Sequence, residues 1–222
     1  MFIPLKDLNP SRTYPFVNIT LILANIVIFL YGLGLQATMS PRAFEALALS
    51  YSEIPARIPS FLAGHTSFEA AFLPLLTSMF LHAGWLHIAG NMLFLWIFGD
   101  NVEDFFGHVT YLFFYLVCGI GAGLLHILFN FHSSIPAVGA SGAISGVMGA
   151  YILLYPSARI LTLVFIFPIP VPAVIFLGLW YILQFMAGLS TIGVKVTGGV
   201  AVWAHVGGFL LGMFLTAVAR RR

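Results

Sequence analysis

The stretch "AVGASGAISGVMGAY", residues 137–151, places small residues four positions apart within an apolar segment. On a helix, Gly142, Gly146 and Ala150 would share one face, where small side chains let a neighbouring membrane helix approach closely. Ser141 stands at the start of this face. The pattern predicts a tightly packed membrane helix, and it leaves open whether Ser141 is a packing residue or a nucleophile.

The composition of the whole chain indicates an integral membrane protein. Of its 222 residues, 60% are hydrophobic and only 7% are charged, whereas a soluble domain carries about 25% charged residues. The single cysteine, Cys118, excludes an intrachain disulfide. We expect one domain over residues 1–222, with its first apolar segment retained and not removed as a signal peptide.

Six apolar segments are long enough to cross a bilayer, which takes about 20 residues of helix. They lie at about residues 17–35, 76–99, 109–129, 138–155, 160–184 and 199–219. The fifth contains Pro168, Pro170 and Pro172, which predict a kinked helix or one that begins as two pieces. The expected fold class is therefore an all-α membrane protein, a bundle of six transmembrane helices.

Basic residues outside these segments predict the orientation, because Lys and Arg concentrate on the cytoplasmic side of a membrane. One side carries six of them: Lys6, Arg12, Arg159, Arg220, Arg221 and Arg222. The other side carries three: Arg42, Arg57 and Lys195. We therefore expect both termini in the cytoplasm.

The long connection between the first two segments, residues 36–75, mixes apolar and charged residues with prolines. In a disordered loop, apolar side chains such as Phe44, Leu47 and Ile54 would lack cover. The pattern favours short amphipathic helices that lie in the membrane interface.

Polar residues early in the second, fourth and sixth segments should lie at similar depth, because all three segments run inward from the outer face. These residues are His82, His87, Asn91, Ser141 and His205. Each lies within about 20 Å of the outer end of its helix, at 1.5 Å per residue.

A second pair of glycines, Gly208 and Gly212, follows His205 in the sixth segment. If this face packs on the glycine face of the fourth segment, Ser141 and His205 come within hydrogen-bonding distance. Such glycine pairs also occur in many membrane helices and specify no particular partner, so the spacing alone leaves the pairing open.

A serine hydroxyl becomes a nucleophile when an adjacent base takes its proton, and neutral histidine is the usual base. His205 is the candidate base for Ser141. Donors for the oxyanion would be the Ser141 N–H, the Asn91 amide and the His87 ring, the last two being i, i+4 on one helix face. The outer parts of the three segments hold no acidic residue, which predicts a Ser–His dyad. The alternatives are that both residues only pack, or that Ser145, one turn deeper, is the nucleophile.

Three stretches together resemble the signature motifs of the rhomboid intramembrane serine proteases. They are "HAGWLHIAGNMLFLWIFGDNVEDFFG" (82–107), "VGASGAISGVMGAY" (138–151) and "AHVGGFLLG" (204–212). Their order and spacing match, and the resemblance covers roughly residues 15–220. It implies a six-helix bundle of rhomboid type, with a long, partly helical interfacial loop between helices 1 and 2, that cuts transmembrane helices of other proteins without metal or ATP.

The resemblance also implies a role for each residue of the candidate site. Ser141 would be the nucleophile and His205 the base, while His87 and Asn91 would stabilise the oxyanion. His82 would support His87 and Asn91 without contacting the reacting atoms. We expect no cofactor, no metal ion and no nucleic acid. The expected partners are transmembrane protein substrates and the lipid bilayer, and the expected location is a bacterial cytoplasmic membrane.

The chain departs from the family pattern in two places. Leu73-Pro74 stands where many members have Trp-Arg, and Ser145 stands where some have an aromatic residue that stacks on the base. Neither change removes a catalytic atom, which favours a serine endopeptidase over a catalytically inactive relative that only binds membrane helices.

Two other functions fit the sequence less well. A zinc hydrolase usually shows H-E-x-x-H, which is missing here, and the i, i+5 spacing of His82 and His87 puts their rings on different faces of a helix. An ion-coupled transporter needs carboxylates or paired charges within its membrane segments, which hold almost none.

Overall fold

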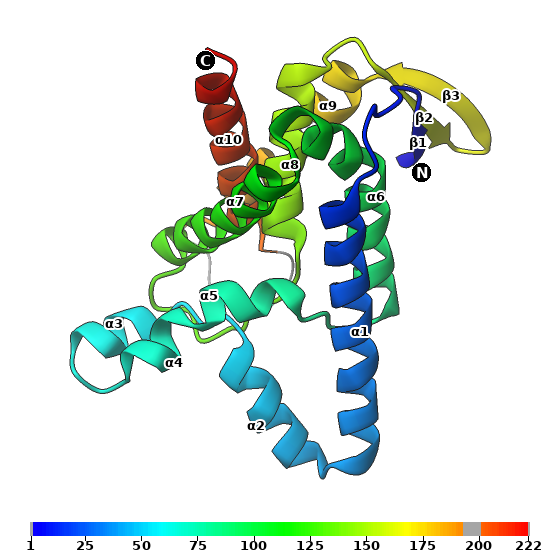
Figure 1. Ribbon diagram of the computed structural model, residues 1–222. Helices are drawn as coiled ribbons and strands as arrows, with labels where there is room; N and C mark the ends of the chain where they lie inside the picture. The colour runs from blue at the N-terminus through cyan, green and yellow to red at the C-terminus, as the bar shows by residue number, and fades with distance from the viewer. Residues whose placement is uncertain (1, 193–200, 222) are drawn as a thin grey trace.

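The computed structural model describes residues 2–192 and 201–221, most of which are helical (Figure 1). Six helices correspond to the predicted segments: α1 (Phe16–Thr38), α6 (Trp85–Phe106), α7 (His108–Phe129), α8 (Ser141–Leu154), α9 (Ala173–Leu189) and α10 (Val202–Ala219). The start of the predicted sixth segment, Lys195 and Arg222 lie outside the described residues.

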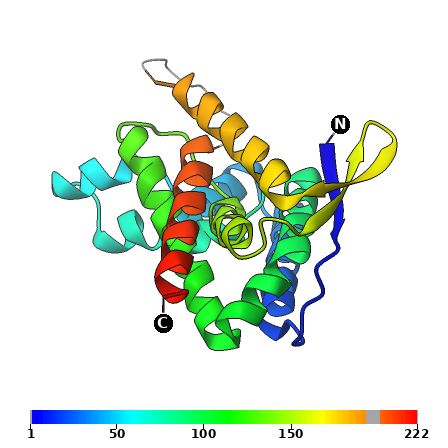
Figure 2. The ribbon, with the colours of Figure 1, turned by 90° about the horizontal axis from the view of Figure 1, so that it is seen from above.

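Helix α8 lies at the centre of the bundle, with other helices around it (Figure 2). Every residue of α8 from Gly142 to Tyr151 is buried. Its glycine face packs directly on α10: a Cβ atom added at Gly208 would overlap the backbone oxygen of Gly142, and one at Gly212 would overlap that of Gly146. The close contact predicted from the two glycine pairs is therefore confirmed.

The second predicted segment, 76–99, is not one straight helix. The pieces Phe68–Phe80 and Trp85–Phe106 meet at a bend of 77°, because the backbone is extended at Leu81 and Gly84 and interrupts the helical hydrogen bonds. Helix α6 also continues past residue 99 to Phe106.

Near the end of α6, the buried carboxylate of Glu103 accepts hydrogen bonds from the first backbone N–H groups of α1, where a negative charge is stabilised.

The long loop contains four short helices, α2 (Pro41–Tyr51), α3 (Arg57–Leu62), α4 (Phe68–Phe72) and α5 (Pro74–Thr77), followed by a single 3₁₀ turn. Helices α3 and α4 project sideways from the bundle (Figure 1), and Phe61 of α3 packs edge-on against Phe68 and Phe72 of α4. At the Leu73-Pro74 position, Pro74 is buried and opens α5. The interfacial location of this loop stays a prediction.

The prediction for the fifth segment, 160–184, is wrong in its first half. Residues 159–172 form a β-hairpin of β2 (Arg159–Val164) and β3 (Phe167–Pro172), and β1 (Phe2–Asp7) completes an antiparallel sheet in the order β1-β2-β3. The three prolines alternate along β3, so their missing N–H groups all point to one side of the strand. An edge strand tolerates such a row of prolines, and a helix does not.

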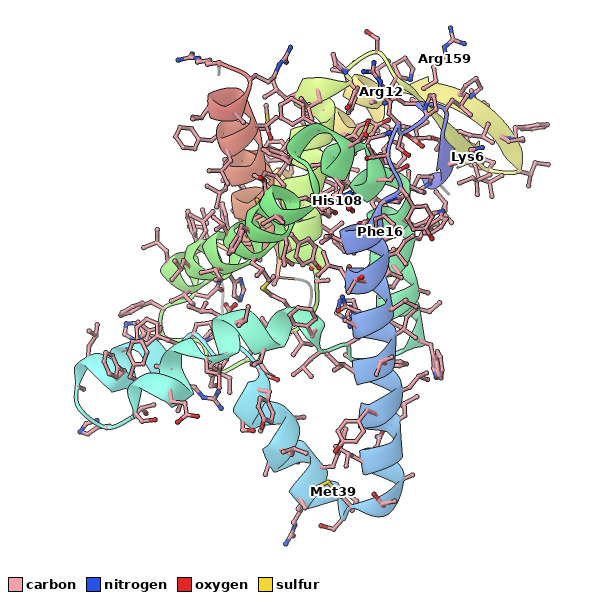
Figure 3. The ribbon with its side chains drawn as sticks, in the orientation of Figure 1. Lys6, Arg12, Phe16, Met39, His108 and Arg159 are labelled. Atoms are coloured by element: carbon pink, nitrogen blue, oxygen red, sulfur yellow. The ribbon has the colours of Figure 1, made fainter. Side chains whose placement is uncertain are left out.

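The helices fit a membrane fold. Within residues 2–192 and 201–221, α1, α7 and α10 are long and apolar enough to span a membrane, the bent pair makes a fourth candidate, and α8 and α9 are shorter apolar helices. A mostly helical membrane fold is confirmed, while six crossings and a single domain stay predictions. Lys6, Arg12 and Arg159 lie at the end that also holds the C-terminus (Figures 1 and 3).

Candidate active site

Ser141 and His205 meet where α8 and α10 begin. Ser141 is the first residue of α8, and His205 lies in the first turn of α10. The Oγ of Ser141 is 2.8 Å from Nε2 of His205, a hydrogen-bonding distance. His205 is only 7% exposed. The glycine faces further along both helices let the backbones approach closely enough for this contact.

The other ring nitrogen of His205 contacts α9, a contact that the sequence analysis missed. Nδ1 of His205 is 2.8 Å from Oε1 of Gln184. Trp180, one turn earlier on α9, lies beside the same imidazole, with ring centroids 5.7 Å apart and ring planes inclined by 38°. The aromatic neighbour that Ser145 cannot supply therefore comes from α9. The signal in the sequence was Gln184 itself, the one amide side chain between residues 173 and 189.

Ser145, the alternative nucleophile, is fully buried one turn below Ser141. Its Oγ donates a hydrogen bond of 2.6 Å to the backbone oxygen of Ser141. Back-bonding of this kind satisfies a serine inside a helix. The hydroxyl proton is therefore directed at the backbone and not at His205, so the geometry favours Ser141.

A cavity of about 640 Å³ opens at the Ser–His pair, and His87 and Asn91 line it together with Ser141 and His205. His87 and Asn91 lie on the same face of α6, as their spacing predicts. A Cβ atom added at Gly139 would come within 2.7 Å of Nε2 of His87 and 3.4 Å of Nδ2 of Asn91. With φ +123°, Gly139 also has a conformation that other residues rarely adopt.

His82 lies in the break before α6, not on a helix, and it contacts the other polar residues of α6. Its Nε2 is 2.9 Å from Nδ2 of Asn91, and its ring packs edge-on against His87, with centroids 5.1 Å apart. An amide N–H only donates, so Nε2 of His82 is the acceptor. The contact fixes which way the Asn91 amide points.

The segment before Ser141 is held by the long loop. Glu53, between α2 and α3, exchanges two backbone hydrogen bonds with Ala137, at 3.1 and 2.8 Å. The Gly139 N–H donates to the backbone oxygen of Ser78 at 2.9 Å. Burial raises the pKa of the Glu53 carboxyl from 4.5 to about 7. The loop therefore holds in place the turn from which Ser141 projects.

These features define a class: a helical membrane protein whose cavity holds a hydrogen-bonded serine–histidine pair. The family follows from comparison with known proteins, in which the Rhomboid domain matches residues 69–222. The chain therefore belongs to the rhomboid family.

Several curated relatives show the same relationship. The chain is 29% identical over 151 residues to the mitochondrial Rhomboid protein 1 of Saccharomyces cerevisiae, a match that covers 64% of this chain and 40% of the yeast protein. It is 35% identical over 148 residues to the mitochondrial RHOMBOID-like protein 6 of Arabidopsis thaliana, covering 64% and 41%. It is 41% identical over 85 residues to the Rhomboid protease GluP of Bacillus subtilis, covering 38% and 16%.

The matched region spans about two fifths or less of the length of these relatives. Their names place two of them in mitochondria, and the organisms include a yeast, a plant and a bacterium. Location in a membrane follows from the family and the apolar helices. The relatives give no support to a bacterial cytoplasmic membrane in particular, so that expectation stays a prediction.

Proposed function

We propose that this chain is an intramembrane serine endopeptidase that hydrolyses peptide bonds in or near transmembrane helices of other membrane proteins. The observation that carries the proposal is the 2.8 Å contact between Ser141 Oγ and His205 Nε2 at the wall of a cavity. Support comes from membership of the rhomboid family and from one relative whose name is that of a protease.

The proposed reaction has two halves. Nε2 of His205 takes the Ser141 proton as Oγ attacks the carbonyl carbon of the substrate, and the carbonyl oxygen becomes an oxyanion. His205 then gives the proton to the departing amine as the C–N bond breaks. In the second half, His205 takes a proton from water, which attacks the acyl-enzyme and releases the acid. Ser141 regains its proton.

The oxyanion would be stabilised by donors that lie around Ser141. The candidates are the backbone N–H of Ser141 at the start of α8, Nδ2 of Asn91 and the ring of His87, and all three residues line the cavity. Losing one such donor costs about 10²- to 10³-fold in kcat. We expect Asn91→Ala to fall in this range while the Ser–His contact stays intact.

The membrane arrangement is part of the same proposal. We propose that α1, α6, α7, α8, α9 and α10 all cross, with both termini in the cytoplasm, so that the cavity faces the opposite side. The substrate would be a transmembrane segment that unwinds near its outer end, because helical carbonyls are already hydrogen-bonded. Small or proline residues near the cut would favour cleavage.

The experiment is labelling of the purified protein with a fluorophosphonate in detergent, followed by peptide mapping of the adduct. We expect an adduct on Ser141, none in Ser141→Ala or His205→Ala, and normal labelling in the control Ser145→Ala. An adduct on Ser145 would transfer the role to that residue. Complete absence of labelling and of substrate cleavage would leave an inactive, helix-binding relative, and loss of cleavage with a chelator would indicate a metal site.

A further inference from the structure

The imidazole of His205 is held from both sides. Nε2 contacts Ser141 at 2.8 Å, and Nδ1 contacts Oε1 of Gln184 at the same distance. His205 is buried at the start of α10, and His87 of α6 and His126 of α7 line the same cavity. The two contacts come from different helices, α8 and α9.

The Gln184 contact decides which nitrogen carries the proton. An amide oxygen has no hydrogen to give, so Nδ1 of His205 must be the donor in this bond. A neutral imidazole has one N–H, and Nε2 is therefore left with a free lone pair. That is the form in which Nε2 accepts the Ser141 proton.

We propose that Gln184 is a positioning residue that holds His205 in the Nδ1–H form, and that it takes the place a carboxylate has in a serine–histidine–aspartate triad. This inference rests on the proposed function. A neutral amide suits the location, because an ionised carboxylate in a membrane segment is costly. A glutamine in the otherwise apolar α9 would also be costly without such a partner.

The test compares Gln184→Met, which keeps the length of the side chain but removes the acceptor, with Gln184→Glu, which keeps it. The matched control is Leu183→Ala, at the exposed neighbouring position of α9. We expect Gln184→Met to slow labelling of Ser141 and substrate cleavage by about 10- to 100-fold, a part of what a general base contributes. Gln184→Glu should restore most of this rate, because a side-chain oxygen is again present to accept the hydrogen bond from Nδ1.

Nitrogen-15 NMR of histidine-labelled protein gives a readout that folding alone does not move. The His205 signal, assigned by its loss in His205→Ala, should show the Nδ1–H form in the wild type and lose this preference in Gln184→Met. Wild-type labelling rates in Gln184→Met, or an unchanged Nδ1–H preference of His205 in that variant, would overturn the role of Gln184 and leave the dyad standing. Absence of Ser141 labelling in the wild type would instead overturn the proposed function.

A different part of the molecule carries a second inference, the tip of the β2–β3 hairpin. Phe165 and Ile166 form its two-residue turn, and with Phe167 they are 75%, 77% and 63% exposed. Phe165 has φ 56°, a conformation that favours glycine or asparagine in such turns. A bulky aromatic residue is unusual in this backbone conformation, and unfavourable conformations of this kind concentrate at functional sites.

The surroundings of the tip indicate what covers it. The hairpin projects outward from the helices (Figure 2), and residues 160–172 carry no charge. The chain then enters the apolar helix α9, whose first exposed residues are Val174 and Ile175, so the apolar surface continues onto that helix. The exposed basic residues Lys6, Arg12 and Arg159 lie around the sheet, beyond the start of α1 at Phe16 (Figure 3). Apolar tips with flanking cations suit the boundary of a bilayer.

We infer that this tip inserts into the lipid leaflet on the side of the termini and anchors the sheet there. The test attaches an environment-sensitive dye to Ile166→Cys in a Cys118→Ala background, with the protein in phosphatidylcholine nanodiscs. The matched control is Ser157→Cys, an exposed position in the turn at the other end of β2.

We expect the dye at residue 166 to be blue-shifted and quenched by lipids that carry a spin label near the headgroup, in discs with one protein each. The dye at residue 157 should respond less. Water-like emission at residue 166 with no quenching would overturn the inference. A blue shift that appears only in discs with two copies would also overturn it, and would assign the tip to self-association.

Discussion

Replacing Glu53 with glutamine should stabilise the protein at alkaline pH. Glu53 is 7% exposed and packs against α7 at Gly123, and within the part of the chain that the structure describes its Oε1 has no hydrogen-bond partner. Burial raises the pKa of this carboxyl from 4.5 to about 7. The folded state therefore holds a proton that the unfolded state has already released between these two pH values.

The sign and size of the effect follow from proton linkage. Between about pH 4.5 and pH 7 the folded state binds more protons, so the contribution of Glu53 to the free energy of unfolding falls as pH rises, and it is fully lost above pH 7. At 1.36 kcal/mol per pKa unit, the loss is about 3 kcal/mol. Glu53→Gln stays neutral and should avoid this loss.

The assay is the free energy of unfolding, measured by SDS titration in mixed micelles from pH 4.5 to pH 8.5. The difference between Glu53→Gln and wild type should grow through this window and reach up to about 3 kcal/mol in favour of the variant at pH 8. Glu45→Gln, at an exposed position on α2, is the control for removing a negative charge. Parallel curves for Glu53→Gln and wild type would refute the buried-carboxyl argument.

Three further changes test the packing and the site. Ser145→Ala removes a 2.6 Å hydrogen bond to the Ser141 carbonyl and should cost about 1 kcal/mol in SDS unfolding, while lost labelling of Ser141 would contradict our assignment. Gly208→Val places a side chain against the α8 backbone and should push α8 and α10 apart. Because a displacement of about 1 Å between reacting groups can cost about 100-fold in rate, we expect fluorophosphonate labelling to slow by about that factor. Near-normal labelling rates would be inconsistent with the close packing. Tyr111→Phe loses the 2.9 Å bond to Asn18 and should cost about 1 kcal/mol with no change in cleavage rate, and slower cleavage would show coupling to the site.

The contact between Ser141 and His205 could be predicted because two independent patterns in the sequence agree. In the predicted topology successive crossings alternate in direction, so the fourth and sixth segments run the same way and place the two residues at similar depth. The glycine spacing in both segments then predicts that the two helices pack closely side by side. In the structure, the backbones of α8 and α10 come into direct contact at Gly208 and Gly212. Similar depth in the membrane and close packing of the two helices together bring Ser141 and His205 into contact.

The hairpin at residues 159–172 could not be predicted from hydropathy, because "ILTLVFIFPIPVP" is as apolar as a membrane helix. Hydropathy measures how readily side chains leave water, and it does not distinguish a helical backbone from an extended one. The deciding signal is the period of two in Pro168, Pro170 and Pro172, which suits a strand edge and excludes a helix. A pairing partner is also needed, and it comes from residues 2–7, far away in the sequence.

The role of α9 was also missed, because its sequence offers one polar amide among apolar residues and no motif. Its exposed middle, at Ile182, Leu183 and Met186, shows that α9 lies at the periphery of the bundle. Yet the same helix supplies Gln184 to one nitrogen of His205 and Trp180 to its ring. If Gln184 fixes the tautomer, the base is in its reactive form only while α9 is packed against α10. A substrate that approaches along α9 must then reach Ser141 without displacing Gln184, or cleavage must wait until α9 has returned.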